Sequence, residues 1–274
     1  MTAVMVRSIG ARYERHRLFI ALIAVAAATA ILLVLGSSVR AGCGLPTDSA
    51  PCTRVLFIGN SYTSVNDLPS VFANLARSGG HRVDAGKAAP DGARLADHAS
   101  SSSTAAAITS AKWNVVVLQE QSQLLSFTRE QWQRETYPFA KALQDKISTD
   151  GARTLLFMTW GYRLGDRHNW PGDTFVGMQA RLAQGYSELA AELPASVAPA
   201  GLAWAEALRR RPGLDLWDSD GRHADKEGSY LAACVFYADL TGRDPARSTF
   251  TGGLQPADAR FLQRVVAGVV RRSG

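Results

Sequence analysis

Apolar and polar residues form alternating blocks along residues 54–274, and the lengths of these blocks predict strands and helices in turn. Short apolar runs of strand length occupy residues 54–58, 81–85, 113–118, 154–159 and 196–200. Longer stretches with apolar residues spaced three and four apart occupy residues 67–77, 127–147, 173–193, 204–210, 226–240 and 256–271. The first pattern is typical of buried parallel strands, and the second of helices with one apolar face.

Strands and helices that alternate this regularly predict an α/β fold. Because crossovers between parallel strands are right-handed, the natural architecture is a three-layer α/β/α sandwich with a parallel, flavodoxin-like, doubly wound sheet. Between the second and third strands we expect a loop at residues 88–92 and a polar, serine-rich stretch at residues 100–104. No internal repeat is visible in the sequence.

A long apolar run precedes this region. Residues 18–36 contain no charge over 19 positions, and four arginines precede them. Such a run is close to the length that crosses a bilayer as a helix, and the arginines predict a cytoplasmic amino terminus. We therefore expect a basic leader (1–17), a hydrophobic helix acting as signal-anchor or signal peptide (18–36), a linker (37–53) and one domain (54–274). Val39-Arg40-Ala41 offers a cleavage site, so the hydrophobic helix is either a retained anchor or a removed signal peptide. In both cases the domain is expected outside the cytoplasm, either membrane-anchored or secreted.

Charge and cysteines narrow the class of protein. The formal net charge is +6, but residues 1–40 carry five arginines and one glutamate, so the domain itself is only weakly basic. This removes most of the argument for a nucleic-acid-binding surface, which requires a clustered basic face. Cys43 and Cys52 in the linker are candidates for a disulfide, whereas Cys234 lies in an apolar helical pattern and is expected to be a buried thiol. No cysteine and histidine cluster has metal-ligand spacing, so no metal is expected.

The first predicted strand runs directly into a small turn. Val55-Leu56-Phe57-Ile58 is followed by Gly59-Asn60-Ser61, and a helical pattern begins within a few residues. Ligands of open α/β sheets bind beyond the carboxyl ends of the strands, so this turn would lift the Ser61 hydroxyl into that crevice. The alternative is that Ser61 merely caps the following helix.

A nucleophilic serine needs a base, and His223 is the best candidate. Asp220 precedes it by three residues in a loop before a helix, where a carboxylate can accept a hydrogen bond from one ring nitrogen. His16 lies on the leader, His81 and His98 lie among polar residues, and His168 lies in another loop. The alternative is that Asp220 caps the turn and His223 is a surface residue.

Taken together, Gly-Asn-Ser after the first strand and Asp-x-x-His before a late helix resemble the SGNH (GDSL-like) hydrolases over most of residues 54–242. The resemblance implies that Ser61 is the nucleophile, His223 the base and Asp220 the residue that orients it. It also implies that the backbone amides of Ser61 and Gly92 form an oxyanion hole, Gly92 matching the glycine of the second sequence block.

The third block departs from that family. The usual Gly-x-Asn-Asp is replaced by Gln119-Glu120-Gln121-Ser122, which resembles the Gln-Gly-Glu-Ser element of sialate and carbohydrate acetylesterases. We therefore expect Gln119, and Gln121 second, to supply the side-chain oxyanion donor, although both are alternatively structural amides at a strand end. Glu120 is expected to pair with an arginine or hold a loop.

The resemblance implies a serine esterase that cleaves a short acyl ester, such as an O-acetyl group on a small molecule or carbohydrate, without a cofactor. Asn60, Gln121, Trp160 and Tyr162 are candidate substrate-binding residues at strand ends. An acyltransferase with the same triad and a non-catalytic glycan-binding module of the cell envelope are the alternatives. A phosphate-binding loop at Gly59-Asn60-Ser61 is disfavoured because the sequence lacks a P-loop or dinucleotide pattern. The membrane is expected as a partner through residues 18–36, and the sequence does not specify an oligomeric state.

Overall fold

The computed structural model describes Cys43 and residues 52–273. A five-stranded parallel sheet with the order β2-β1-β3-β4-β5 forms its centre. The strands are β1 (Cys52–Ile58), β2 (Arg82–Ala88), β3 (Val115–Leu118), β4 (Arg153–Phe157) and β5 (Ser196–Ala198). This is the flavodoxin-like order, in which the direction of winding reverses between β1 and β3 and opens a crevice at their carboxyl ends. The predicted fold class is confirmed.

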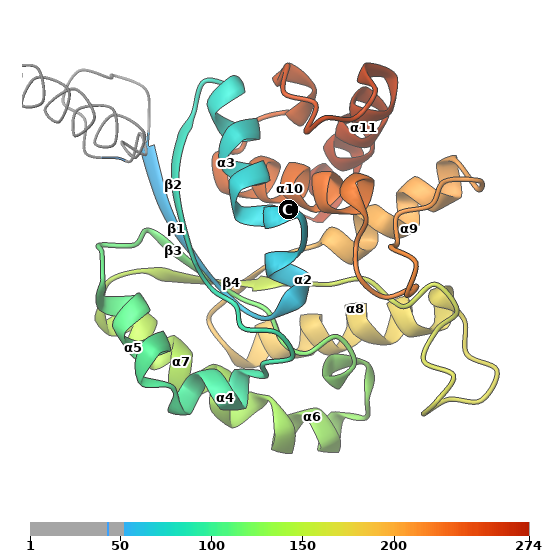
Figure 1. Ribbon diagram of the computed structural model, residues 1–274. Coiled ribbons are helices and arrows are strands. Elements are labelled where there is room, and N and C mark those ends of the chain that lie inside the picture. Colours follow the sequence, from blue (N-terminus) through green and yellow to red (C-terminus); the bar gives the residue numbers. More distant parts are fainter. Residues whose placement is uncertain (1–42, 44–51, 274) are drawn as a thin grey trace, which may run out of the picture. The chain divides into compact units, whose positions relative to one another are not determined.

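Helices cover both faces of the sheet (Figure 1). One face carries α3 (Leu68–Ser78), α9 (Ala200–Arg210), α10 (Lys226–Thr241) and α11 (Pro256–Ser273). The other carries α4 (Leu95–Ser100), α5 (Ser102–Thr109), α6 (Arg129–Glu135), α7 (Tyr137–Thr149) and α8 (Phe175–Glu192). The short helices are α2 (Ser61–Ser64), η1 (Val65–Asp67), η2 (Leu124–Ser126) and η3 (Pro245–Arg247).

The core is built from the apolar runs that the sequence shows. Residues 55–58 of β1 are at most 1% exposed because both faces of the strand are covered. The ring of Phe57 lies edge-on to Phe72 of α3 and Phe236 of α10, with centroids 6.0 and 5.1 Å apart. Burying such rings removes large apolar areas from water, which stabilises the sheet that positions the strand ends.

One expectation about helices is wrong. The single helix expected over residues 127–147 is two helices, α6 and α7, separated at Thr136, where φ is −125° and ψ is −50°. Pro138 lacks an amide hydrogen and would clash with the carbonyl of the preceding turn, so a continuous helix is disfavoured there. The helix α5 begins within the serine-rich stretch, where the Ser101 side chain caps it by accepting a hydrogen bond from the Thr104 amide.

The leader (1–17), the hydrophobic segment (18–36) and nearly all of the linker (37–53) lie outside the described residues. Among the helices that the structure does describe, none combines the length and apolar character needed to cross a bilayer. Cys43 and Cys52 are both disulfide-bonded, and Cys234 is a buried free thiol on α10.

Candidate active site

Ser61 lies where β1 meets α2, at the carboxyl edge of the sheet. The side chain of Asn60, and not that of Ser61, caps α2 by accepting a hydrogen bond from the Tyr62 amide at 3.1 Å. The capping alternative for Ser61 is therefore wrong. The Ser61 hydroxyl lies 2.8 Å from Nε2 of His223, which is 162 positions away in the sequence.

His223 and Asp220 form the second half of this arrangement. Nδ1 of His223 lies 2.5 Å from one carboxylate oxygen of Asp220. The other carboxylate oxygen accepts hydrogen bonds from the backbone amides of Arg222 and His223, at 2.8 and 2.9 Å. With the carboxylate accepting from Nδ1–H, Nε2 carries the lone pair and can accept the Ser61 proton. Serine, histidine and aspartate thus stand in one hydrogen-bonded line.

The electrostatics of Asp220 suit that arrangement. Partial burial alone would raise the pKa of Asp220, but hydrogen bonds from the His223 ring and from two backbone amides lower it overall. The carboxylate is therefore ionised at neutral pH, and it holds the imidazole ring in one orientation and one tautomer.

The loop that carries His223 is held by backbone carbonyls. Trp160 donates its indole N–H to the Arg222 carbonyl at 2.9 Å, and the Arg163 amide donates to the Gly221 carbonyl at 2.9 Å. Asn66 ties the far end of the loop to the segment after Ser61. Its side-chain amide lies 3.0 Å from the carbonyl oxygens of Ala224 and Asp225. Asn66 adopts a left-handed φ of 53°, a conformation that asparagine tolerates better than most residues.

The expectation that Gln119 donates to an oxyanion is wrong. Its side-chain oxygen accepts from the Asn60 amide at 2.9 Å and the Thr63 hydroxyl at 3.0 Å, which assigns oxygen and nitrogen unambiguously. Its NH2 group donates to the Asn60 side chain at 3.0 Å and to the Glu120 carbonyl at 2.5 Å. Both hydrogens are used, so Gln119 supports the nucleophile turn from within the protein.

This support also explains the glycine of the turn. A Cβ atom at Gly59 would lie 2.4 Å from the Gln119 side-chain oxygen and 2.6 Å from the Thr63 hydroxyl. Only glycine allows the backbone to approach the buried amide so closely. The turn is thus shaped by a side chain 60 positions later in the chain.

Gly92 lies on the loop beside the turn. Asn60 donates its side-chain N–H to the carbonyl of Ala93 at 2.9 Å, which links the Gly92 loop to the Ser61 turn. Gly92 has a φ of +71°, is exposed, and its amide donates to no other described residue. The Ser61 amide, at the first position of α2, is likewise one of the amides that a helix leaves unpaired. Two backbone donors are therefore available near the nucleophile.

Two buried titratable residues lie in this region: Glu120, which was expected to pair with an arginine or hold a loop, and His98, which was not identified as a site residue from the sequence. Glu120 accepts hydrogen bonds from the amides of Leu95 and Gln121, at 3.1 and 2.7 Å, and burial raises its pKa. His98 is only 2% exposed, which corrects the expectation of a polar surface position. Its ring nitrogens lie 2.8 Å from the Gly59 carbonyl and 2.8 Å from the Thr104 hydroxyl, and burial lowers its pKa.

The candidate substrate-binding residues have different surroundings. Asn60 and Trp160 are 3% and 0% exposed, so they support the site from below. Trp160 stacks between Trp204 and Tyr62, with centroids 4.3 and 5.1 Å away. Gln121 is half-buried and shares hydrogen bonds with Gln123. Neither Asn60 nor Trp160 can contact a substrate unless the site rearranges.

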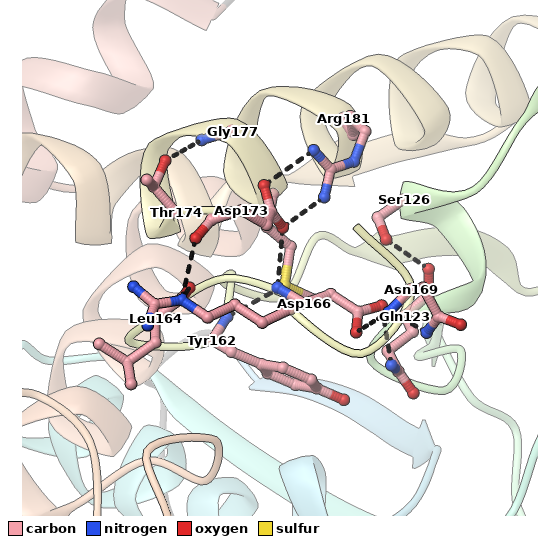
Figure 2. Close-up of polar contacts among 12 residues, drawn as sticks. Gln123, Ser126, Tyr162, Leu164, Asp166, Asn169, Asp173, Thr174, Gly177 and Arg181 are labelled. Atoms are coloured by element: carbon pink, nitrogen blue, oxygen red, sulfur yellow. Dashed lines mark hydrogen bonds and ion pairs between the residues drawn. The ribbon is translucent and has the colours of Figure 1, made fainter. Parts of the chain in front are cut away.

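Tyr162 lines an open cavity of about 490 Å³ that adjoins Asp220. Its hydroxyl lies 2.8 Å from the Ser122 hydroxyl at the end of β3. One wall of the cavity is the loop at residues 162–168, which the buried carboxylates of Asp166 and Asp173 hold in place (Figure 2). Asp173 accepts from Arg181 of α8 and from the Asp166 amide. Within the described part of the chain, no group of side chains has the composition of a metal site.

No known protein-family profile and no curated protein matches this chain. Solved structures do match. A DUF4886 family protein from Bacteroides uniformis has 18% identity and a TM-score of 0.71, and covers 82% of this chain and 97% of its own. A putative SGNH hydrolase from Slackia heliotrinireducens has 28% identity and a TM-score of 0.56, and covers 69% of this chain and 99% of its own.

A mutant of an acetyl-xylooligosaccharide esterase from a Geobacillus species is also similar. It has 14% identity and a TM-score of 0.52, and covers 72% of this chain and 98% of its own. That likeness concerns the fold alone. With the sheet order, the serine at the end of β1 and the similarity to the Slackia protein, the chain belongs to the SGNH superfamily of serine hydrolases that act on esters.

Proposed function

We propose that this protein hydrolyses a short acyl ester, an O-acetyl group on a carbohydrate, with Ser61 as nucleophile. The observation that carries the proposal is the hydrogen-bonded line from Ser61 through His223 to Asp220. A neutral serine hydroxyl is a poor nucleophile unless a base within hydrogen-bonding distance removes its proton, and here that distance is 2.8 Å.

The reaction then follows from the positions of these groups. Ser61 Oγ attacks the ester carbonyl carbon while Nε2 of His223 takes its proton. Asp220 stabilises the imidazolium that forms. The protonated His223 returns the proton to the departing alcohol oxygen, which leaves an acyl group on Ser61. A water molecule, activated by the same Nε2, hydrolyses that acyl-enzyme and restores the serine.

The oxyanion donors in this mechanism are the backbone amides of Ser61 and Gly92. Gln121 is the third donor, in place of Gln119. Its side-chain nitrogen donates one hydrogen to Gln123 at 3.2 Å, which leaves the second hydrogen for the substrate. Removal of one such donor typically lowers the rate by about 10²–10³-fold. Gln121→Leu should therefore lower kcat far more than it raises KM.

Fewer observations support the choice of an acetyl ester than support the roles of Ser61, His223 and Asp220. The third block resembles that of carbohydrate acetylesterases, and the fold resembles that of a solved acetyl-xylooligosaccharide esterase. The cavity beside Asp220 is open and lined by polar side chains, which suits the sugar half of an ester better than a long acyl chain.

The test is hydrolysis of p-nitrophenyl acetate and p-nitrophenyl octanoate by residues 42–274, with Ser61→Ala as control. We expect turnover of the acetate to exceed that of the octanoate, and no turnover above background with Ser61→Ala. A fluorophosphonate probe should label Ser61 in the wild type alone. Equal rates in the wild type and Ser61→Ala would refute the esterase proposal and favour the glycan-binding module.

We also propose that the domain works outside the cytoplasm, attached through residues 18–36. The uncharged run, the arginines before it and the disulfide-bonded state of Cys43 and Cys52 support this. The intact mass of the protein from a membrane fraction should include the leader. A mass that matches a chain beginning near residue 42 would instead indicate a cleaved signal peptide.

A further inference from the structure

The cavity beside Asp220 carries positive side chains that the proposed hydrolysis does not use. Its walls are the loop at residues 162–168 and the turn at residues 219–222. The turn is followed directly by His223. A group bound here would therefore belong to the same molecule as the ester that Ser61 attacks. The chemistry of the cavity is set by three arginines, Arg163, Arg167 and Arg222, and each has different partners.

Arg163 is already paired. Its guanidinium lies 2.8 and 2.7 Å from the two carboxylate oxygens of Asp215, and it also donates to the Trp217 carbonyl at 3.2 Å. These contacts hold the loop before His223, so Arg163 has a structural role. Its charge is balanced by Asp215 and offers little to a ligand.

Arg222 is not paired in this way. Its guanidinium carbon lies 5.1 Å from the centroid of the Tyr162 ring, and the side chain is exposed. Among the described residues, no carboxylate or carbonyl accepts a hydrogen bond from this guanidinium. A guanidinium held over an aromatic ring is oriented but keeps its donors for a planar anion, which it can bind through two parallel hydrogen bonds.

Arg167 faces the same cavity. Its Nε donates to the carbonyls of Leu164 and Asp173, at 3.1 and 3.3 Å, which fixes the side chain along the loop. Its two terminal nitrogens have no acceptor among the described residues. Two arginines, from opposite walls, therefore offer unused donors to one cavity.

The carboxylates of the cavity are already used. Asp166 is 2% exposed and accepts from the side chains of Gln123 and Asn169, at 2.9 and 2.8 Å (Figure 2). Asp220 accepts from His223 and two backbone amides. The carboxylate oxygens thus have their own donors, whereas the guanidinium donors of Arg167 and Arg222 await an acceptor.

We propose that this cavity binds an anionic group, a carboxylate, on the alcohol half of the ester, with Arg222 as its main ligand and Arg167 as its second. The substrate is then an acylated acidic sugar, not a neutral one. This inference rests on the proposed hydrolysis at Ser61 and specifies its substrate class.

The experiment compares two substrates that differ only in charge: a mono-acetylated methyl glucuronoside and the carboxamide of the same compound. The wild type should show at least about a tenfold higher kcat/KM for the acid, because a hydrogen bond to a charged group exceeds one to a neutral group by about that factor. The preference should fall as salt rises. An acetylated methyl glucoside 6-phosphate distinguishes phosphate from carboxylate, and a preference for the phosphate would replace the carboxylate assignment.

Arg222→Gln should abolish the preference for the acid, mainly through KM, so that the acid and the amide are cleaved with similar kcat/KM. Arg167→Gln should weaken the preference to a smaller extent. Arg260→Gln, an exposed arginine on α11, is the matched control and should change neither rate. Equal kcat/KM values for acid and amide in the wild type, or an unchanged preference in Arg222→Gln, would overturn the inference.

A binding measurement separates this inference from the proposed function. The Ser61→Ala protein, titrated with methyl glucuronoside and its carboxamide, should bind only the acid with measurable affinity. Binding of the acid without any esterase activity in the wild type would retain the anion site and refute the hydrolase. Esterase activity with equal binding of both compounds would retain the hydrolase and refute the anion site.

Discussion

The two halves of the site are built in different ways. The turn that carries Ser61 is supported by buried polar side chains, and Asn60 and Gln119 are 3% and 0% exposed. The loop that carries the base is open to solvent, with 31% of the His223 side chain and 42% of the Asp220 side chain exposed. The nucleophile is thus held by the core, whereas the base is held by a few hydrogen bonds at the surface.

This difference separates stability from activity. A buried polar group that loses its partner costs free energy of unfolding, because water cannot replace the missing hydrogen bond. An exposed side chain can be removed at little cost in stability, since water hydrates what remains. Mutations on the Ser61 side should therefore lower stability and activity together. Mutations on the His223 side should lower activity alone.

The largest effect is expected for His223→Ala. Loss of the base should lower kcat by about 10⁴-fold or more. The melting temperature should change by no more than about 2 °C, because the ring is partly exposed and its backbone contacts remain. Ester hydrolysis and thermal unfolding of the same sample test both parts. A decrease in melting temperature of 8 °C or more would show that His223 is structural as well.

Gln119→Leu should mainly affect stability. It removes the partners of the Asn60 amide and the Thr63 hydroxyl inside the protein, which should lower the free energy of unfolding by about 3 kcal/mol. Activity should fall as well, because the turn carrying Ser61 loses its support. Denaturant unfolding measures the loss, and Gln255→Leu on the surface is the matched control. A folded protein of normal stability but lower kcat would instead return Gln119 to a direct catalytic role.

Asn66→Ala tests the tether between the two halves. Its amide links the segment after Ser61 to the carbonyls of Ala224 and Asp225, next to His223. Loss of the tether should lower kcat about tenfold with little change in KM, because a small misplacement of catalytic groups slows the reaction. Asn66→Gly accommodates the positive φ without strain, so it should be more stable than Asn66→Ala. Its kcat should be as low as that of Asn66→Ala, because the tether is absent in both variants. Full activity in both variants would show that the two halves need no tether.

The smallest effect is expected at Asp225, the residue that caps α10. Burial, with repulsion from Glu227 and Asp215, raises the pKa of Asp225 to about 6. Because this pKa is above the unfolded value near 4, the folded state binds more protons between pH 4 and 6. Its stability therefore decreases as pH rises through that window.

Asp225→Asn should remove the dependence of stability on pH in this window. It should keep the cap of α10, since an asparagine side chain accepts a hydrogen bond from the Gly228 amide equally well. The variant should be more stable than the wild type by about 1 kcal/mol above pH 6, and equally stable near pH 4, after allowance for solvent screening. Melting temperatures at pH 4, 5, 6 and 8 measure this. A variant that is less stable at pH 8 would show that the Asp225 charge contributes favourably.

Much of the fold could be predicted because it depends on local pattern. The apolar run at residues 55–58 has one low-energy environment, the middle of a covered sheet, so its position followed from its composition. The closeness of Asp220 and His223 also followed, because three residues of a turn span a short distance. The break at Pro138 could have been predicted from the same sequence, since proline disfavours a helix interior.

Tertiary structure alone decided the partners of the buried polar groups. Gln119 and Gln121 are the same residue type two positions apart, yet only Gln119 faces the Ser61 turn, and its two amide hydrogens go to the Asn60 side chain and the Glu120 carbonyl. His98 looks like a surface residue in its polar neighbourhood, but it is 2% exposed and its ring nitrogens lie against the Gly59 carbonyl and the Thr104 hydroxyl. The residue type determines which groups a side chain can bind. A hydrogen bond forms only when donor and acceptor are about 3 Å apart, so the actual partner depends on the fold. The fold must therefore bring distant residues together before their roles can be known.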